Sequence, residues 1–143
     1  VFTAWANATV QAMRPTDVLI NGYPMFHVAG VLPGALCSLH VGMETIIPSA
    51  SLFRNPQVIR HYWRLVEAHG CTLVSAVPTA LAALMAVPLD GTDVHTLRSV
   101  RTGAAPLPPE LAQRIQRTLG VVVNESLGMT ETVGLSSVAP PGG

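Results

Sequence analysis

Short apolar runs alternate with amphipathic stretches through the middle of this chain, and this alternation limits the possible folds more than any other feature. Apolar runs of strand length are followed by segments whose apolar residues recur at helical spacing, which predicts βαβ units. Such units build a mainly parallel sheet with right-handed crossovers and helices on its faces, so we expect an α/β fold. The predicted strands cover 17–23, 44–48, 71–77, 98–102, 121–125 and 134–139.

The predicted helices are marked by end signals as well as by periodicity. Asn55 and Pro56 supply an N-cap followed by proline at the first helical position, and Gly70 is placed to end that helix. Another helix should follow His27, where Pro33 is tolerable only in the first turn. Two further helices are expected over 79–87 and 108–119.

The charges of the chain argue against two classes of partner. Eight arginines balance eight carboxylates, and a neutral chain has no electrostatic reason to bind nucleic acid or an acidic membrane surface. The sequence contains no lysine. Any mechanism that needs an ammonium group against a phosphate or an anhydride oxygen must therefore take that group from outside this chain.

Length and apolar patterning indicate the size and setting of the domain. A chain of 143 residues is long enough for one domain, so we expect a single α/β segment over 1–143, incomplete at both ends. The longest apolar run, 28–39, is too short to cross a bilayer, and no transmembrane segment is expected. Cys37 and Cys71 lie in separate apolar stretches, as buried reduced thiols of a cytoplasmic protein would.

Four loops follow predicted strands, and each has unusual chemistry. Ligands of open parallel sheets bind at the carboxyl ends of the strands, so these loops are the candidate site. They cover 24–30, 77–79, 103–107 and 126–132.

The loop over 126–132 presents a hydroxyl beside a carboxylate, in Thr130 and Glu131. A threonine hydroxyl can donate to a phosphate oxygen, and a neighbouring carboxylate can hold Mg²⁺ that contacts the same phosphate. The alternative is a turn with a solvated Thr-Glu pair. The small residues of 103–107 would let a flat ligand pack on the backbone, or would simply lead into the next helix.

His27 is the third candidate, because it stands beside Phe26 where a strand ends and a helix begins. Its imidazole could face a cleft, and a satisfied structural histidine is the alternative. The His, Cys, Asp and Glu residues form no cluster with metal-ligand spacing, so no zinc site is expected. The glycine motifs of P-loop and dinucleotide sites do not occur.

The order of four motifs points to a known family. An aromatic-His-x-x-Gly motif at 26–30 precedes Val-Pro-Thr at 77–79, Gly-Ala-Ala-Pro-Leu at 103–107 and the more specific Gly-Met-Thr-Glu-Thr at 128–132. This order resembles the adenylate-forming (AMP-binding) superfamily of acyl- and aryl-CoA synthetases, luciferases and peptide-synthetase adenylation domains. The resemblance runs from about residue 17 to residue 137, and it implies an internal part of the large N-terminal domain of an acyl-CoA synthetase.

The resemblance also implies a role for each motif. Thr130 would bind the α-phosphate of ATP, Glu131 would hold Mg²⁺ with the phosphates, and His27 would gate the approach of the thiol, so these three would be the catalytic residues. The nucleotide would be bound by Gly103, Ala104, Ala105, Pro106, Glu125, Ser126, Leu127, Gly128, Met129 and Thr130. The acyl and coenzyme A pocket would contain Phe26, His27, Val77 and Pro78.

The implied activity is that of an ATP-dependent acid–thiol ligase. A carboxylic acid attacks the α-phosphorus of ATP and pyrophosphate leaves; coenzyme A then displaces AMP from the acyl-adenylate. The implied partners are the acid, ATP, Mg²⁺, coenzyme A and the remaining N- and C-terminal parts of the same enzyme. The implied setting is fatty acid metabolism in the cytoplasm.

The sequence also departs from the family pattern. Leu127 stands where the family usually has an aromatic residue that stacks on adenine. The phosphate loop ending in Pro-Lys-Gly, the ribose-binding aspartate, the hinge and the C-terminal lysine lie outside the chain, so we predict that this polypeptide alone does not catalyse adenylation. The alternatives are an adenylation domain that loads a carrier protein, a non-catalytic nucleotide-binding α/β module and a purely structural domain.

Overall fold

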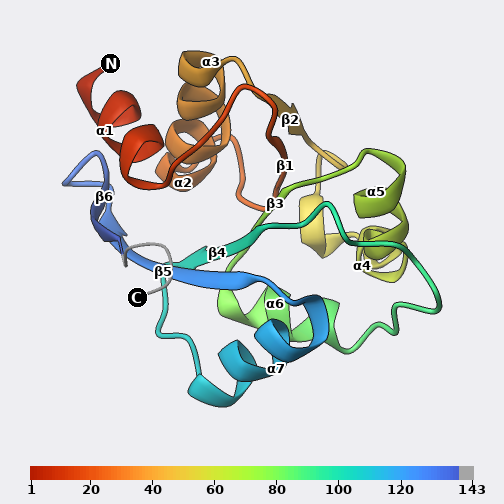
Figure 1. The fold of residues 1–143 in the computed structure, drawn as a ribbon. Coiled ribbons are helices and arrows are strands. Elements are labelled where there is room, and N and C mark those ends of the chain that lie inside the picture. The colour runs from red at the N-terminus through yellow and green to blue at the C-terminus, as the bar shows by residue number, and fades with distance from the viewer. Residues whose placement is uncertain (139–143) are drawn as a thin grey trace.

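The computed structural model describes residues 1–138, which form a six-stranded sheet in the order β2-β1-β3-β4-β5-β6 (Figure 1). Neighbouring strands are parallel except for β5 and β6, which are antiparallel. The prediction of a mainly parallel α/β fold is therefore confirmed. The strands are β1 Val18–Asn21, β2 Glu44–Ile46, β3 Leu73–Ser75, β4 Ser99–Gly103, β5 Val122–Met129 and β6 Gly134–Val138.

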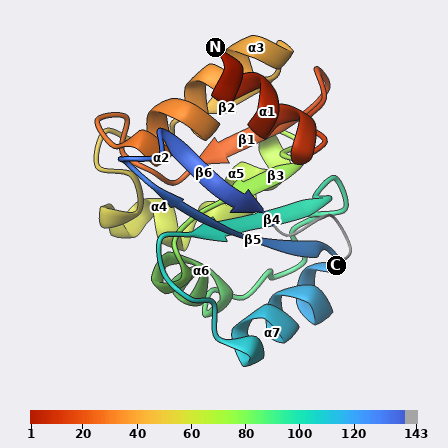
Figure 2. The ribbon, with the colours of Figure 1, turned by 90° about the vertical axis from the view of Figure 1, so that its left-hand side faces the viewer.

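Helices cover both faces of this sheet (Figure 2). One face carries α1 Phe2–Val10, α2 Val28–Val31 and α3 Cys37–Val41, with a π-helical turn over Leu32–Leu36. The other face carries α4 Pro56–Arg60, α5 Tyr62–Ala68, α6 Pro78–Met85 and α7 Pro109–Leu119. The α4–α5 segment begins as predicted, because the Asn55 side chain accepts a hydrogen bond from the Gln57 amide at 3.0 Å.

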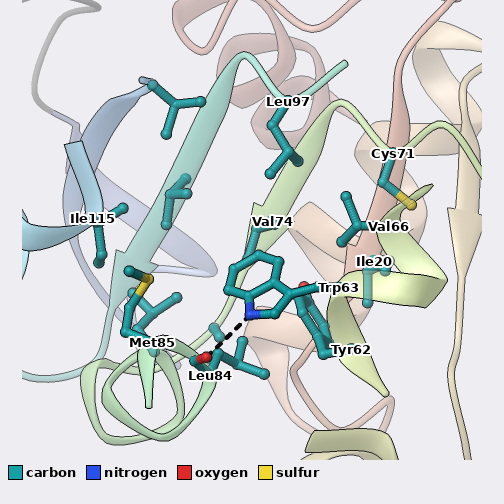
Figure 3. Close-up of a cluster of buried hydrophobic side chains, with 14 of the residues drawn as sticks. Ile20, Tyr62, Trp63, Val66, Cys71, Val74, Leu84, Met85, Leu97 and Ile115 are labelled. Carbon is teal, nitrogen blue, oxygen red and sulfur yellow. Dashed lines mark hydrogen bonds between the residues drawn. The ribbon is translucent and has the colours of Figure 1, made fainter. Parts of the chain in front are cut away.

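The main core lies between the sheet and the face that carries α4 to α7. Side chains from the middle of three strands, Ile20, Val74 and Val100, pack there against buried residues of these helices. Figure 3 shows Trp63 among them, with its indole N–H donating to the Leu84 carbonyl at 3.2 Å. We call this side of the sheet the apolar face.

The opposite side of the same strands is polar toward their carboxyl ends. Asn21 pairs with Ser75, Ser75 with Arg101, and Arg101 with Asn124. Paired residues of neighbouring strands point to the same side of a sheet, so these four residues form a row across β1, β3, β4 and β5. All four are buried. We call this the polar row.

Helix α1 was not predicted from the sequence. Its buried residues are Ala4, Asn7 and Ala8, and the two alanines pack against Leu32 and Cys37. Because its inner face is built from small and polar residues, the apolar periodicity that would indicate a helix is weak.

Two other expectations were wrong. Pro33 lies inside the helical segment that runs from α2 to α3, where the Cys37 amide donates to the Leu32 carbonyl in a π-turn. The wider turn accommodates a proline that a regular α-helix interior would not. The segment 126–132 is not a loop throughout, because β5 continues to Met129 through its pairing with β6.

The remaining predicted elements are confirmed with shifted ends, and Ala139, the last residue of the final predicted strand, lies outside the described residues. Cys37 and Cys71 are buried free thiols. Among residues 1–138, no helix is both long and apolar enough to cross a membrane.

Candidate functional site

A cavity of about 260 Å³ lies at the carboxyl ends of the strands. It is lined by three of the four predicted loops, because the parallel sheet brings those strand ends to one edge. The predicted site residues in its wall are His27, Gly103, Ala104, Ser126, Gly128, Met129, Thr130 and Glu131.

A second cavity, of about 410 Å³, contains the fourth predicted loop in its wall. Phe26 and Val77 line it, whereas Tyr23 lines both cavities and stands between them. Burial raises the pKa of Tyr23 to about 12, and a hydrogen bond with the Gly103 backbone offsets only part of that rise, so the phenol is neutral at physiological pH. The predicted site residues that line neither cavity are Pro78, Ala105, Pro106, Glu125 and Leu127.

His27 is held by the start of α2. Its Nδ1 atom accepts a hydrogen bond from the Ala29 amide at 3.1 Å and so caps the helix. A neutral imidazole that accepts at Nδ1 carries its proton on Nε2. The ring therefore has a donor to offer to a ligand in the cavity. Gly30, three residues later, has to be glycine because a Cβ atom there would collide with the Pro24 carbonyl.

Thr130 and Glu131 are exposed in the turn that joins β5 and β6. Thr132 fixes this turn, since its hydroxyl accepts a hydrogen bond from the Met129 amide at 3.2 Å and lies 3.0 Å from the Gly134 carbonyl oxygen. Within residues 1–138, neither the Thr130 hydroxyl nor the Glu131 carboxylate makes a side-chain hydrogen bond. Both groups are available to a ligand.

Close packing explains the glycine at the start of the Gly-Ala-Ala-Pro-Leu segment. A Cβ atom at Gly103 would lie 2.9 Å from the Ser126 carbonyl oxygen, so a larger residue would push β4 and β5 apart. Ala104 follows with φ 68°, a left-handed conformation that costs a non-glycine residue on the order of 1–2 kcal/mol. Such strain is concentrated where backbone is shaped for a ligand.

A metal ion would find one carboxylate in this cavity. Mg²⁺ keeps several waters and is completed by substrate phosphates, so the exposed Glu131 fits as its single protein ligand. A metal site built from protein ligands alone is not found among residues 1–138. In the described part of the chain, no group of three His, Cys, Asp or Glu side chains could hold an ion.

The sequence interpretation missed the inner wall of the cavity. Gln11 and Arg101 line it, and both are buried. The Arg101 guanidinium donates to the Gln11 carbonyl oxygen at 3.0 Å. The sequence did contain a signal for Arg101, because a charged residue is unusual inside a strand otherwise made of small and apolar residues. Gln11 had none, because it is the C-cap residue that follows the unpredicted helix α1.

The arrangement thus has two chemically different ends. Exposed groups that suit phosphate and a divalent cation, Thr130 and Glu131, lie at the rim. The imidazole of His27, also exposed, lies in the same wall. A buried cation, Arg101, lines the inner end. Such a cavity can bind an anionic ligand across its length.

The characterised proteins to which this chain is similar include CoA ligases. The chain is 32% identical over 122 residues to marinolic acid–CoA ligase from Pseudoalteromonas sp. (strain SANK 73390), which covers 85% of this chain and 19% of the relative. It is also 32% identical over 123 residues to sulfoacetate–CoA ligase from Cupriavidus necator, covering 84% of this chain and 22% of that protein. The chain therefore spans about a fifth of the length of these relatives.

Solved structures agree in fold. The N-terminal domain of FACL13 from Mycobacterium tuberculosis superposes with a TM-score of 0.84 at 25% identity, over 97% of this chain and 34% of that one. ATP-bound MatB from Rhodopseudomonas palustris superposes with a TM-score of 0.81 at 25% identity, over 98% of this chain and 26% of that one. The family model for AMP-binding enzymes matches residues 1–143. The chain is accordingly a member of the AMP-binding enzyme family.

Proposed function

We propose that the full-length enzyme carrying this chain activates a carboxylic acid as an acyl-adenylate and transfers the acyl group to coenzyme A. The observation that carries the proposal is the convergence of His27, Thr130 and Glu131, from two distant segments, in one cavity at the strand ends. Family membership and the CoA ligases among the relatives support it.

In this proposal the chain positions charge rather than supplying a nucleophile. Thr130 donates a hydrogen bond to the α-phosphate of ATP, and Glu131 holds Mg²⁺, which neutralises phosphate charge when bound. The acid attacks the α-phosphorus and pyrophosphate leaves; the thiol then displaces AMP. Phosphoryl chemistry of this kind depends mainly on positioning and electrostatic stabilisation.

His27 and the second cavity would serve the acyl-transfer half of the reaction. In this proposal the donor at His27 Nε2 would face the thiol as it approaches the acyl-adenylate. The second cavity, lined by Phe26 and Val77, would admit the pantetheine arm, and Tyr23 would form the boundary between the two routes. Because the chain has no lysine, an ammonium group for the phosphates would come from the rest of the enzyme. Cytoplasmic location and a place in fatty acid metabolism stay predictions.

The test is carboxylate-dependent ATP–pyrophosphate exchange on the full-length enzyme, with a panel of fatty, aromatic and dicarboxylic acids. Glu131→Gln should lower exchange by roughly 100-fold or more, as expected for a group that stabilises transition-state charge. Glu110→Gln, an exposed carboxylate on α7, is the matched control and should keep full activity.

Three outcomes separate the alternatives. Exchange followed by coenzyme A consumption supports the ligase, whereas exchange followed by acylation of a carrier protein supports a carrier-loading domain. Mg-ATP binding without exchange for any acid contradicts adenylation and supports the nucleotide-binding module. The exposed, non-aromatic Leu127 favours that last reading and makes Leu127→Tyr its first follow-up.

A further inference from the structure

The inner end of the first cavity contains a buried cation without an anion. The Arg101 side chain belongs to the polar row and is 6% exposed. One Nη atom donates to the Gln11 carbonyl oxygen at 3.0 Å, and the Nε atom has no hydrogen-bond partner within residues 1–138. A buried charge is expensive unless it is paired, so this arrangement is a place where an anion would be strongly stabilised.

The acidic groups nearby are engaged elsewhere. Asp17, the carboxylate that influences Arg101, is bound to Arg98, whose Nε atom donates to it at 2.8 Å. Cys37 is also close, but burial raises the pKa of its thiol to about 11, so it is neutral at physiological pH. Glu131 lies at the exposed rim. No ion pair of Arg101 occurs in the described part of the chain.

Arg101 keeps its charge in spite of burial. Burial and the nearby Arg98 lower the pKa of Arg101 to about 10, while Asp17 opposes that change. At neutral pH the guanidinium is therefore still protonated. The energetic cost of the buried charge is not relieved by loss of the proton at neutral pH, and an anion bound in the cavity would offset it.

A second buried donor accompanies the guanidinium. Gln11 is 5% exposed, lines the same cavity, and its Nε2 amide group has no hydrogen-bond partner in the described chain. The hydrogen bond from the Arg101 guanidinium to the main-chain carbonyl oxygen of Gln11 holds the two residues together. Two unsatisfied buried donor groups at one end of a cavity match the acceptor oxygens of a carboxylate.

The position of Arg101 along β4 gives the direction of the ligand. Gly103 ends β4, the next residue, Ala104, is exposed and lines the cavity, and Arg101 precedes Gly103 by two residues. Two strand residues correspond to about 7 Å, so Arg101 lies that far inside the sheet edge. An acid whose reacting carboxylate is at the rim would direct its other end toward Arg101.

We propose that Arg101 and Gln11 bind a second carboxylate at the far end of the acid, so that this enzyme selects dicarboxylic over monocarboxylic acids. The inference rests on the proposed function, since it names the acid class for the same cavity. It predicts that the distal carboxylate pairs with the guanidinium and the Gln11 amide, and that a methyl-terminated acid leaves both donors unsatisfied. A site built around buried polar groups rejects such analogues strongly.

The test compares α,ω-dicarboxylic acids with monocarboxylic acids of the same length in ATP–pyrophosphate exchange by the full-length enzyme. The wild-type enzyme should prefer the matched diacid in kcat/KM by roughly 100-fold or more. Arg101→Met should remove that preference, chiefly by lowering kcat/KM with the diacid. Arg101→Lys should restore part of it, because the charge returns without the planar fork. Arg117→Met, on the exposed side of α7, is the control and should change neither rate.

The outcomes distinguish a failure of the dicarboxylate inference from a failure of the proposed ligase function. Exchange that favours monoacids, or a diacid preference that survives in Arg101→Met, overturns the dicarboxylate inference and leaves the ligase intact. No exchange with any acid overturns the ligase; the site is then judged by calorimetric titration of the best-fitting diacid into the full-length protein. Binding that is lost in Arg101→Met and in Gln11→Leu supports the site, and no binding to the wild-type protein overturns it.

Discussion

The two faces of the central sheet bury their side chains in opposite ways. On the apolar face, Ile20, Val74 and Val100 pack against helices in one continuous hydrophobic cluster. On the other face, the polar row places four buried polar residues side by side. Of the six buried side-chain polar atoms without a partner in residues 1–138, four belong to this second side: those of Asn7, Gln11, Arg101 and Asn124.

The difference teaches where stability and chemistry reside in this fold. Apolar burial supplies the main favourable term of folding, and it is concentrated on the side away from the cavity. Unsatisfied buried polar groups are costly, and three of the six in residues 1–138 belong to residues that line the cavity: Gln11, Arg101 and Thr102. Substitutions on the apolar face should therefore lower the stability of the fold, whereas substitutions on the face that carries the polar row should change substrate binding.

The largest expected effect is on the apolar face. Trp63→Ala in the full-length enzyme should lower the free energy of unfolding by about 3–5 kcal/mol, because it leaves a cavity among buried side chains. It also leaves the Leu84 and Val87 carbonyls without the indole donor. Denaturant unfolding measures the loss. Trp5→Ala, at a residue 47% exposed, is the matched control, and equal losses for both would contradict the comparison.

A smaller loss is expected at the edge of the other face. The Asp17 carboxylate accepts hydrogen bonds from Arg98, from the Thr72 hydroxyl at 2.8 Å and from the Arg14 amide at 2.8 Å. Asp17→Asn should cost about 2–3 kcal/mol, less than a fully buried pair because Arg98 is partly exposed. Thermal unfolding measures it, with the exposed Asp93→Asn as control. A neutral result would show that Arg98 finds another anion.

The same pair predicts a pH dependence. Burial would raise the pKa of Asp17, but the hydrogen bonds from Arg98, Thr72 and Arg14 outweigh burial and hold it below 3.8. Because the folded-state pKa is the lower one, the stabilisation is complete above that unfolded value and is lost as pH falls through the folded-state pKa. Unfolding free energies of wild type and Asp17→Asn should therefore converge in strong acid. A constant difference down to that range would contradict the assignment.

A modest effect is expected at the helix that covers the apolar face. Asn55→Ala removes the N-cap of α4 and should cost about 1 kcal/mol in the free energy of unfolding. Asn55→Asp keeps an acceptor for the Gln57 amide and should restore most of the loss in the same denaturant titration. If both variants lose equally, the cap does not stabilise the helix.

The smallest stability effect is expected at Arg101, and it sharpens the comparison most. Replacing a buried charge by an apolar side chain of similar length is often neutral or stabilising. Arg101→Met should therefore leave the melting temperature of the ligand-free enzyme unchanged or raise it, although it alters acid selection. A clear loss of thermal stability would place Arg101 among the residues that hold the fold.

Much of the fold was predictable because local signals agreed with the tertiary structure. The nearly continuous apolar run over 71–77 predicted β3, and Asn55 with Pro56 predicted the start of α4. The end of β5 was not predictable, because residues 127–129 become a strand only through pairing with β6. Helix α1 also escaped, since its inner face contains alanine and asparagine instead of large apolar residues.

By itself, the sequence determined the alternation of strands and helices, the family motifs and the residues available for chemistry at strand ends. These depend on properties local to each segment: apolar period, caps and turn residues. The tertiary structure alone decided that Arg101 and Gln11, 90 residues apart, meet at the inner end of the cavity. Their contact depends on strand register and on the position of α1 against the sheet. Both arise from packing between distant segments, which local sequence patterns do not predict.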